Sequence, residues 1–74
     1  MEIKVRLFAT LREGRGKELM VQMDERPTPQ KIIETLDIKK EDVAILLING
    51  RDGSLDKALE AEDVVSIFPP VGGG

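Results

Sequence analysis

The segment Val64–Phe68 constrains the fold more than any other part of the chain. Its sequence, Val-Val-Ser-Ile-Phe, has high β propensity and places apolar side chains on both faces of a strand. Such a strand is normally covered on both faces, so we expect it in the interior of a sheet, next to the first strand and parallel to it. Pro69 and Pro70 end this strand, because proline has no backbone N–H to donate.

The N-terminal part of the chain predicts a hairpin. Over Glu2–Phe8 the side chains alternate, and three apolar residues share one face of the expected strand: Ile3, Val5 and Leu7. The alternation is lost over Ala9–Glu13, and Gly14–Gly16 marks a reversal. Lys17–Asp24 alternates again, which indicates a second, antiparallel strand after a wide turn.

One helix is predicted over about Pro29–Leu36. Pro27 breaks the preceding strand, Thr28 is a suitable N-cap, and Pro29 suits the first helical position, where an N–H has no partner in any case. The apolar residues of this segment form one stripe, which we expect to cover the sheet: Ile32, Ile33 and Leu36.

The segments after this helix indicate a third strand and a short helical turn. Val43–Ile48 is a continuous apolar run, so we expect a buried strand, which Asn49-Gly50 ends in a tight turn. Arg51–Gly53 extends that turn region. In Ser54–Glu60 two leucines stand four residues apart, which favours a short helical turn.

In this order the elements resemble the ubiquitin-like β-grasp. The fold class is α+β, with a mixed sheet and one main helix packed on one face. We expect residues 1–68 to form the β-grasp domain and residues 69–74 to form a flexible, glycine-rich C-terminal tail.

Composition excludes most kinds of independent chemistry. The 74 residues contain no Cys and no His, so the chain cannot build a thiolate or imidazole metal site, a cysteine nucleophile or a histidine-based triad. A domain this small can hardly enclose a desolvated carboxylate beside a substrate cleft. We therefore expect a protein that is not itself an enzyme and binds neither a metal nor a cofactor.

Charge and hydropathy limit the kinds of partner that this chain can have. Residues 1–31 hold seven Lys and Arg against five Asp and Glu, and residues 32–74 hold four against nine. The basic excess is too weak to track phosphates, and without Trp or Tyr there are few stacking platforms, so we do not expect nucleic acid. The acidic half could steer a basic partner, although a run such as Glu60–Asp63 is more often a solvated loop.

No apolar run could span a membrane or act as a signal peptide, so we expect a cytoplasmic protein.

Three apolar residues do not fit a simple two-layer arrangement. Phe8 and Met20 fall on the faces opposite the main core sets, and Phe68 is out of phase with its neighbours in the last strand. An exposed apolar patch marks a contact site. The alternative is that these side chains pack under the Ala9–Glu13 loop or under the tail.

The chain ends in Gly72, Gly73 and Gly74. These residues place a terminal carboxylate on a backbone without side chains, which can pass through a channel too narrow for other residues. With Pro69–Val71 they reach at most roughly 20 Å when extended, far enough to enter a partner's active site. The alternative is an inert terminal extension.

Two segments together carry a family resemblance: Leu-Phe-Ala-Thr-Leu-Arg-Glu at residues 7–13 and Ile-Phe-Pro-Pro-Val-Gly-Gly-Gly at residues 67–74. They resemble the MoaD/ThiS family of ubiquitin-like sulfur carriers, most closely its MoaD-type members, the small subunits of molybdopterin synthase. The resemblance extends over essentially the whole chain in length and element order.

This resemblance implies a carrier. An E1-like (MoeB-like) partner would use ATP and Mg²⁺ to adenylate the carboxylate of Gly74, and sulfur transfer would then give a thiocarboxylate. The loaded tail would enter a MoaE-like large subunit and donate sulfur to a pterin precursor, forming the dithiolene of molybdopterin.

The resemblance also assigns site residues. Gly73 and Gly74 are the reactive tail, and the residues expected to contact partners are Phe8, Arg12, Phe68, Pro69, Pro70, Val71 and Gly72. For Phe8 and Phe68 the alternative is core packing, and for Arg12 it is a solvated charge or a local pair with Glu13.

Three other functions remain open. Sulfur could go to the thiazole of thiamine or to a tRNA base. The same activated carboxylate could form isopeptide bonds to lysines, as in ubiquitin-like modifiers, or the chain could be a β-grasp interaction module with an unmodified tail.

Overall fold

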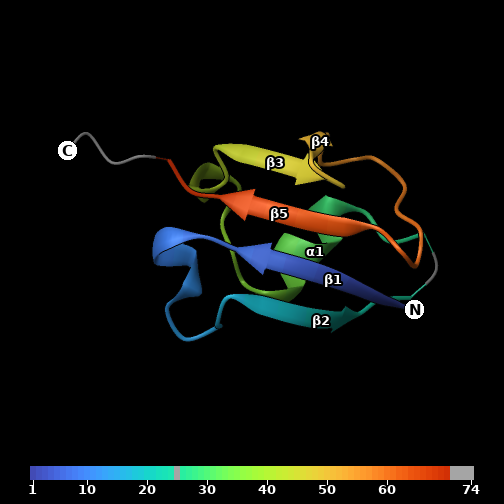
Figure 1. Ribbon diagram of the computed structural model, residues 1–74, viewed down its shortest axis with the longest axis horizontal. Helices are drawn as coiled ribbons and strands as arrows, with labels where there is room; N and C mark the ends of the chain where they lie inside the picture. Colours follow the sequence, from blue (N-terminus) through green and yellow to red (C-terminus); the bar gives the residue numbers. More distant parts are fainter. Residues whose placement is uncertain (25, 71–74) are drawn as a thin grey trace.

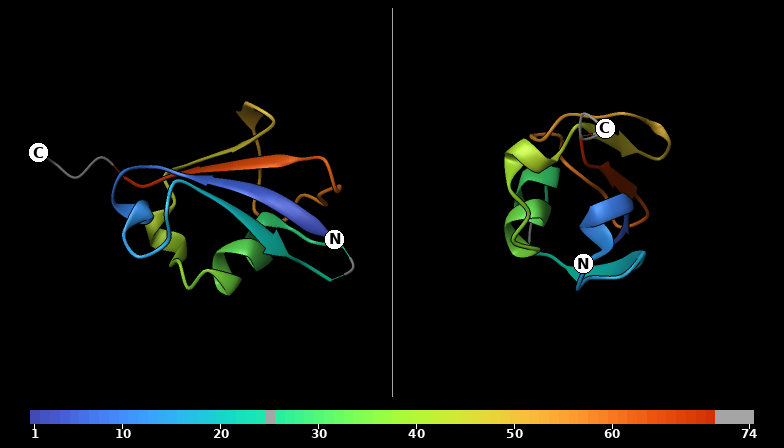
Figure 2. Two further views of the ribbon diagram at one scale, coloured as in Figure 1. Left: turned by 60° about the horizontal axis from the view of Figure 1, so that its bottom comes forward. Right: turned by 90° about the vertical axis from the view of Figure 1, so that its left-hand side faces the viewer.

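The computed structural model describes residues 1–24 and 26–70. In chain order the elements are β1 (Glu2–Leu7), η1 (Ala9–Arg12), β2 (Glu18–Gln22), α1 (Pro29–Thr35), η2 (Lys40–Asp42), β3 (Ile45–Ile48), β4 (Arg51–Asp52) and β5 (Val64–Phe68), where η marks a 3₁₀-helix. The strands form one five-stranded sheet in the order β2-β1-β5-β3-β4. Helix α1 covers one face of this sheet and leaves the other face open (Figures 1 and 2).

The last strand lies in the interior of the sheet, as its sequence predicts. β5 pairs in parallel with β1, from Lys4↔Val64 to Leu7↔Ile67, and antiparallel with β3 on its other side. The fold is therefore the α+β β-grasp arrangement that the element order indicates (Figure 1).

The N-terminal hairpin is confirmed. β1 and β2 pair antiparallel from Glu2↔Gln22 to Arg6↔Glu18. The wide turn between them contains η1, where the alternation of the sequence is lost, and Gly14 and Gly16, whose φ angles of +72° and +98° favour glycine.

The predicted helix is confirmed within one residue at its C-terminal end. The hydroxyl oxygen of Thr28 accepts a hydrogen bond of 3.3 Å from the backbone N–H of Lys31, and Pro29 occupies the first turn. Ile32 and Ile33 are buried, and Leu36 is half-buried at the C-cap. The core between α1 and the sheet includes Ile3, Val5, Leu7, Leu11, Val21, Met23, Ile32, Ile33, Ile38, Leu46, Ile48, Leu59, Val65 and Ile67.

The predicted helical turn over Ser54–Glu60 is wrong. Apart from one turn-type bond, from Lys57 N–H to Ser54, the backbone bonds of this segment go elsewhere: Leu59 N–H donates to Pro27, and Leu55 accepts from the N–H of Gln30. These partners lie at the N-terminus of α1, so the segment is bonded to the start of that helix instead of forming a helical turn of its own. Its leucines still contribute apolar contacts to the core.

The third strand is shorter and less buried than its sequence predicts. β3 covers Ile45–Ile48, and its burial alternates, so that Ile45 is 50% exposed while Leu46 and Ile48 are buried. The predicted tight turn at Asn49-Gly50 is confirmed, with φ angles of +54° and +79°. Beyond it the chain forms the short strand β4, where the sequence predicts only an extension of the turn.

Within residues 1–24 and 26–70, no helix combines the length and apolar character that crossing a bilayer would require.

Candidate functional site

Phe8 and Phe68 stack on each other beside the end of β5. The parallel register Leu7↔Ile67 brings the next residue of each chain segment side by side. The two ring centroids are 4.1 Å apart and the ring planes differ by 8°. Both side chains are half-buried. The pair lies on the face of the sheet opposite α1, because the flanking residues Leu7 and Ile67 are buried on the helix side.

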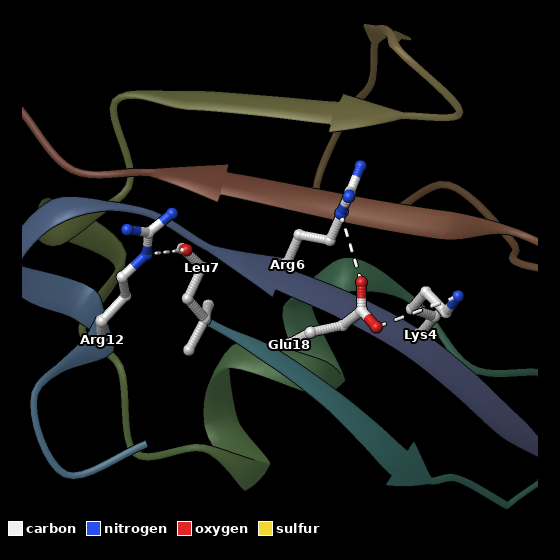
Figure 3. A network of polar contacts seen from close by, with 5 residues as sticks. All are labelled: Lys4, Arg6, Leu7, Arg12 and Glu18. Atoms are coloured by element: carbon white, nitrogen blue, oxygen red, sulfur yellow. Dashed lines mark hydrogen bonds and ion pairs between the residues drawn. The ribbon is translucent and has the colours of Figure 1, made fainter. Parts of the chain in front are cut away.

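Arg12 extends this aromatic pair. Its guanidinium carbon is 5.3 Å from the centroid of the Phe8 ring, within the range of a cation–π contact. Its Nε donates a hydrogen bond of 2.8 Å to the backbone carbonyl of Leu7 (Figure 3). Neither predicted alternative for Arg12, a solvated charge or a local pair with Glu13, describes this contact. The 3₁₀-helix η1 produces it by turning the chain back over the end of β1.

The open face continues the apolar surface onto β3. Ile45 pairs with Phe68, and Leu47 pairs with Ser66 in the same ladder. Ile45 is 50% exposed and Leu47 is half-buried. The question left open by the sequence is therefore answered in part: the two rings pack on each other and not in the core, and together with Ile45 they form an accessible apolar patch. We call Phe8, Arg12, Ile45 and Phe68 the aromatic site.

Pro69 and Pro70 leave the sheet beside the aromatic site. They border a groove whose other walls come from η1, η2 and the residues next to them, including Leu11, Ile38 and Asp42. Pro69 is half-buried and Pro70 is exposed. The chain thus enters residues 71–74 from a defined position at the end of β5.

Arg15 fixes the loop that holds Arg12. Its Nε donates to the carbonyl of Leu36 at 3.1 Å, and its two terminal nitrogens donate to the carbonyls of Asp37 at 3.2 Å and Leu11 at 3.3 Å. The side chain therefore connects η1 with the C-terminal end of α1, whose carbonyls lack helical partners. No sequence pattern predicts this role, because Arg15 stands between two glycines in an apparent surface turn.

Basic residues surround one carboxylate next to the aromatic site. Glu18 on β2 lies 3.4 Å from the Nε of Arg6 and 4.0 Å from the Nζ of Lys4, both on β1 (Figure 3). All three side chains are exposed, so each ion pair contributes little to stability. They nevertheless leave this part of the open face with a net positive charge.

The structure brings the predicted site residues Phe8, Arg12, Phe68, Pro69 and Pro70 together at one end of the sheet. The other predicted residues, Val71, Gly72, Gly73 and Gly74, lie outside the described residues. Ile45 is not among the predicted site residues, because the apolar run Val43–Ile48 predicts a strand buried on both faces. The strand order, with β3 next to β5, would have been needed to place it beside Phe68.

Among the described residues, no group of three or more Asp or Glu side chains is placed to hold a metal ion. The described site residues form an apolar and cationic surface beside the end of β5.

Comparisons with known proteins agree with this architecture. The model of the ThiS family matches residues 5–74. Small archaeal modifier protein 3 from Haloferax volcanii is 33% identical, with all of both chains aligned. SAMP1 from the same organism superposes with a TM-score of 0.81 at 27% identity, and all of both chains are covered. The putative molybdopterin converting factor, subunit 1, from Pyrococcus furiosus superposes with a TM-score of 0.80 at 30% identity, covering 96% of this chain and 99% of that one.

The family match extends over nearly the whole chain and includes both segments that carry the resemblance. Its members are small ubiquitin-like carriers and modifiers, not enzymes. The chain belongs to the ThiS family, the ubiquitin-like proteins that include MoaD-like sulfur carriers and small archaeal modifiers.

Proposed function

We propose that this protein carries sulfur as a thiocarboxylate on Gly74 and delivers it for molybdopterin synthesis. An E1-like enzyme adenylates the C-terminal carboxylate with ATP and Mg²⁺, and pyrophosphate leaves. A sulfur nucleophile then attacks the carbonyl carbon and displaces AMP. Activation is needed because a carboxylate is a poor acyl electrophile.

One structural observation supports this proposal most directly. The stacked Phe8 and Phe68 rings, with Arg12 over one of them, lie at the end of β5 that leads through Pro69 and Pro70 to the glycines. A partner that binds the aromatic site is therefore held next to the start of the C-terminal segment. Aromatic and arginine side chains are the types that most often dominate the free energy of protein–protein binding.

The molybdopterin assignment is supported by the similarity to the Pyrococcus furiosus protein, a putative molybdopterin converting factor subunit 1. In this function the aromatic site binds first the adenylating enzyme and then a MoaE-like large subunit. The loaded residue Gly74 donates sulfur to the pterin precursor inside the large subunit, and the chain itself binds no cofactor.

Deleting Gly74 tests the proposal in the host cell. We expect molybdopterin formation to be lost, while circular dichroism and the urea midpoint of the purified variant stay unchanged. Intact wild-type protein from cells should include a species heavier by one oxygen-to-sulfur exchange, which the deletion lacks. Asp56→Asn, an exposed change in the loop before β5, is the matched control and should behave as wild type. Normal cofactor levels in the deletion strain would refute the proposal.

A second function is favoured by the 33% identity with small archaeal modifier protein 3. The same acyl-adenylate could react with lysine amines and form isopeptide bonds. Because Lys57 is the last basic residue, trypsin would leave the segment Ala58–Gly74 on each modified lysine. A search for this long remnant in digests of host proteins tests the modifier function independently of molybdopterin levels.

A further inference from the structure

The outer edge of β2 has free backbone groups. β2 lies at one end of the sheet and pairs only with β1 among the described strands. The backbone N–H of Met23 donates to Met1 at 2.7 Å, and that of Leu7 donates to Lys17 at 2.9 Å. Because hydrogen-bonded pairs alternate along an antiparallel ladder, Lys17, Leu19, Val21 and Met23 face β1. The N–H and C=O groups of Glu18, Met20 and Gln22 therefore point outward.

The two edges of the sheet differ. β4, at the opposite edge, has only two residues, Arg51 and Asp52, both exposed and charged, and short charged edge strands resist pairing. β2 has five residues, and Met20 at its centre is 54% exposed. Its one charged residue, Glu18, already lies near Lys4 and Arg6 (Figure 3), so its carboxylate is largely compensated within the molecule.

We propose that β2 pairs antiparallel with β2 of a second copy of this chain, around a twofold axis at Met20. In this register Met20 faces Met20 of the second copy, Glu18 faces Gln22, and Gln22 faces Glu18. All three outward-pointing residues of each strand then form hydrogen-bonded pairs. If the register of the two β2 strands shifts by two residues in either direction, one outward-pointing residue of each strand loses its backbone hydrogen-bond partner.

Side chains in this register are complementary. Each Glu18 carboxylate lies next to a Gln22 amide, which can donate a hydrogen bond to it, so the two copies do not place like charges opposite each other. The two exposed Met20 side chains meet on the open face and cover each other. Methionine suits such a contact because its side chain is flexible and apolar.

The dimer joins two five-stranded sheets into one continuous sheet. Since the two β2 strands run antiparallel, the aromatic sites of the two copies lie toward opposite ends of the joined sheet, away from the axis. The interface is narrow, below the size of stable complexes, so the dimer is weak and reversible. The inference does not depend on the proposed function.

Sedimentation equilibrium and NMR diffusion test the proposal over about 10 μM to about 1 mM, a range that brackets weak association. We expect a concentration-dependent dimer, together with slower amide hydrogen exchange at Glu18, Met20 and Gln22 at high concentration. Leu19 and Val21 exchange should not depend on concentration, because their N–H groups already face β1.

Charge variants locate the interface. Met20→Lys places two like charges opposite each other and should abolish the dimer, and Met20→Glu should do the same. Mixing the two variants should restore association, which also shows that both are folded. Ile45→Lys is the matched control, since Ile45 is equally exposed on the same face but lies on β3, and it should still dimerise.

Three outcomes would overturn the proposal. The wild-type chain could remain monomeric at the highest concentration. The mixture of the two Met20 variants could fail to associate while each variant keeps a wild-type circular dichroism spectrum. Ile45→Lys could abolish the dimer while Met20→Lys leaves it intact, which would place the interface at the aromatic site.

Discussion

At the scale of single residues, Phe8 and Phe68 lie outside the hydrophobic core that holds the sheet and the helix together. Their rings lie on the open face and not in the core, so they contribute stacking and area to a surface that solvent reaches. Arg12 adds a fixed positive charge above one ring. Under the proposed function, we expect changes at these residues to cost little stability and much partner affinity.

Phe8→Ala should weaken binding to the adenylating enzyme or to the MoaE-like subunit by about tenfold or more, because an aromatic anchor is lost. The free energy of unfolding should fall by only about 1 kcal/mol, the usual worth of an aromatic pair. Titration calorimetry and urea unfolding measure the two quantities. Val64→Ala, a half-buried residue on the same face at the start of β5, should leave affinity unchanged. Equal losses of affinity in both variants would contradict the assignment of the aromatic site.

At the scale of elements, a polar network joins the β3–β4 turn to the loop before β5. The amide nitrogen of Asn49 donates to one carboxylate oxygen of Asp63 at 2.8 Å, and the N–H of Glu60 donates to the other at 2.9 Å. The side-chain oxygen of Asn49 accepts from the N–H of Val64 at 2.9 Å. The network holds the start of β5 in register beside β3.

These hydrogen bonds lower the pKa of Asp63 below its ordinary value of 3.8; the bond from the Glu60 N–H is the largest cause, followed by the Asn49 amide and the charge of Lys57. The carboxylate therefore stabilises the fold above pH 3.8, and this contribution is lost as the pH falls through the folded-state pKa. We expect the stability difference between wild type and Asp63→Asn, measured by urea unfolding, to stay constant from neutral pH down to about 3.8 and to shrink as the pH falls from there through the folded-state pKa. A difference independent of pH would show that the carboxylate charge contributes nothing.

Much of the element order could be predicted from residue pattern. Three elements could be predicted from neighbouring residues alone. The signals are the alternation in β1, the Thr28-Pro29 start of α1 and the apolar residues of β5. The segment after Gly53 could not be predicted in the same way. Its backbone partners, Pro27 and Gln30, are distant in sequence, so no local period reveals them. The strand β4 consists of two charged residues and has no apolar pattern at all.

The candidate site could be predicted only in part, because local signals identify single residues but not their neighbours from distant segments. Phe8 and Phe68 stood out because they broke the pattern of their strands, and the resemblance added Arg12 and the C-terminal residues. The stacking of the two rings required the parallel register of β1 and β5. The exposure of Ile45 required the knowledge that α1 covers only one face (Figure 2).

At the scale of the whole molecule, Arg15 connects the hairpin with the helix. On the usual scale a chain of this length has a free energy of unfolding of about 4 to 11 kcal/mol, so one well-placed side chain matters. Arg15 donates to three backbone carbonyls, two of them at the end of α1. It therefore stabilises the packing of two units that are far apart in sequence.

Arg15→Ala should lower the free energy of unfolding by about 1 to 3 kcal/mol, because carbonyl oxygens at the end of α1 lose their charged donor. Arg15→Lys keeps the charge but not the planar set of donors, so its free energy of unfolding should lie between those of wild type and Arg15→Ala. Urea unfolding at neutral pH gives both values. If the alanine variant were as stable as wild type, water would be replacing the guanidinium at no cost.

The central position of β5 has a mechanical consequence. This strand is bonded to β1 on one side and β3 on the other, and its C-terminal end leads to the segment that a partner would hold under the proposed function. Tension applied there runs along the strand axis, so it shears both ladders at once and cannot peel them apart bond by bond. Under the proposed function, we therefore expect the domain to stay folded when an enzyme draws the terminal glycines into its active site.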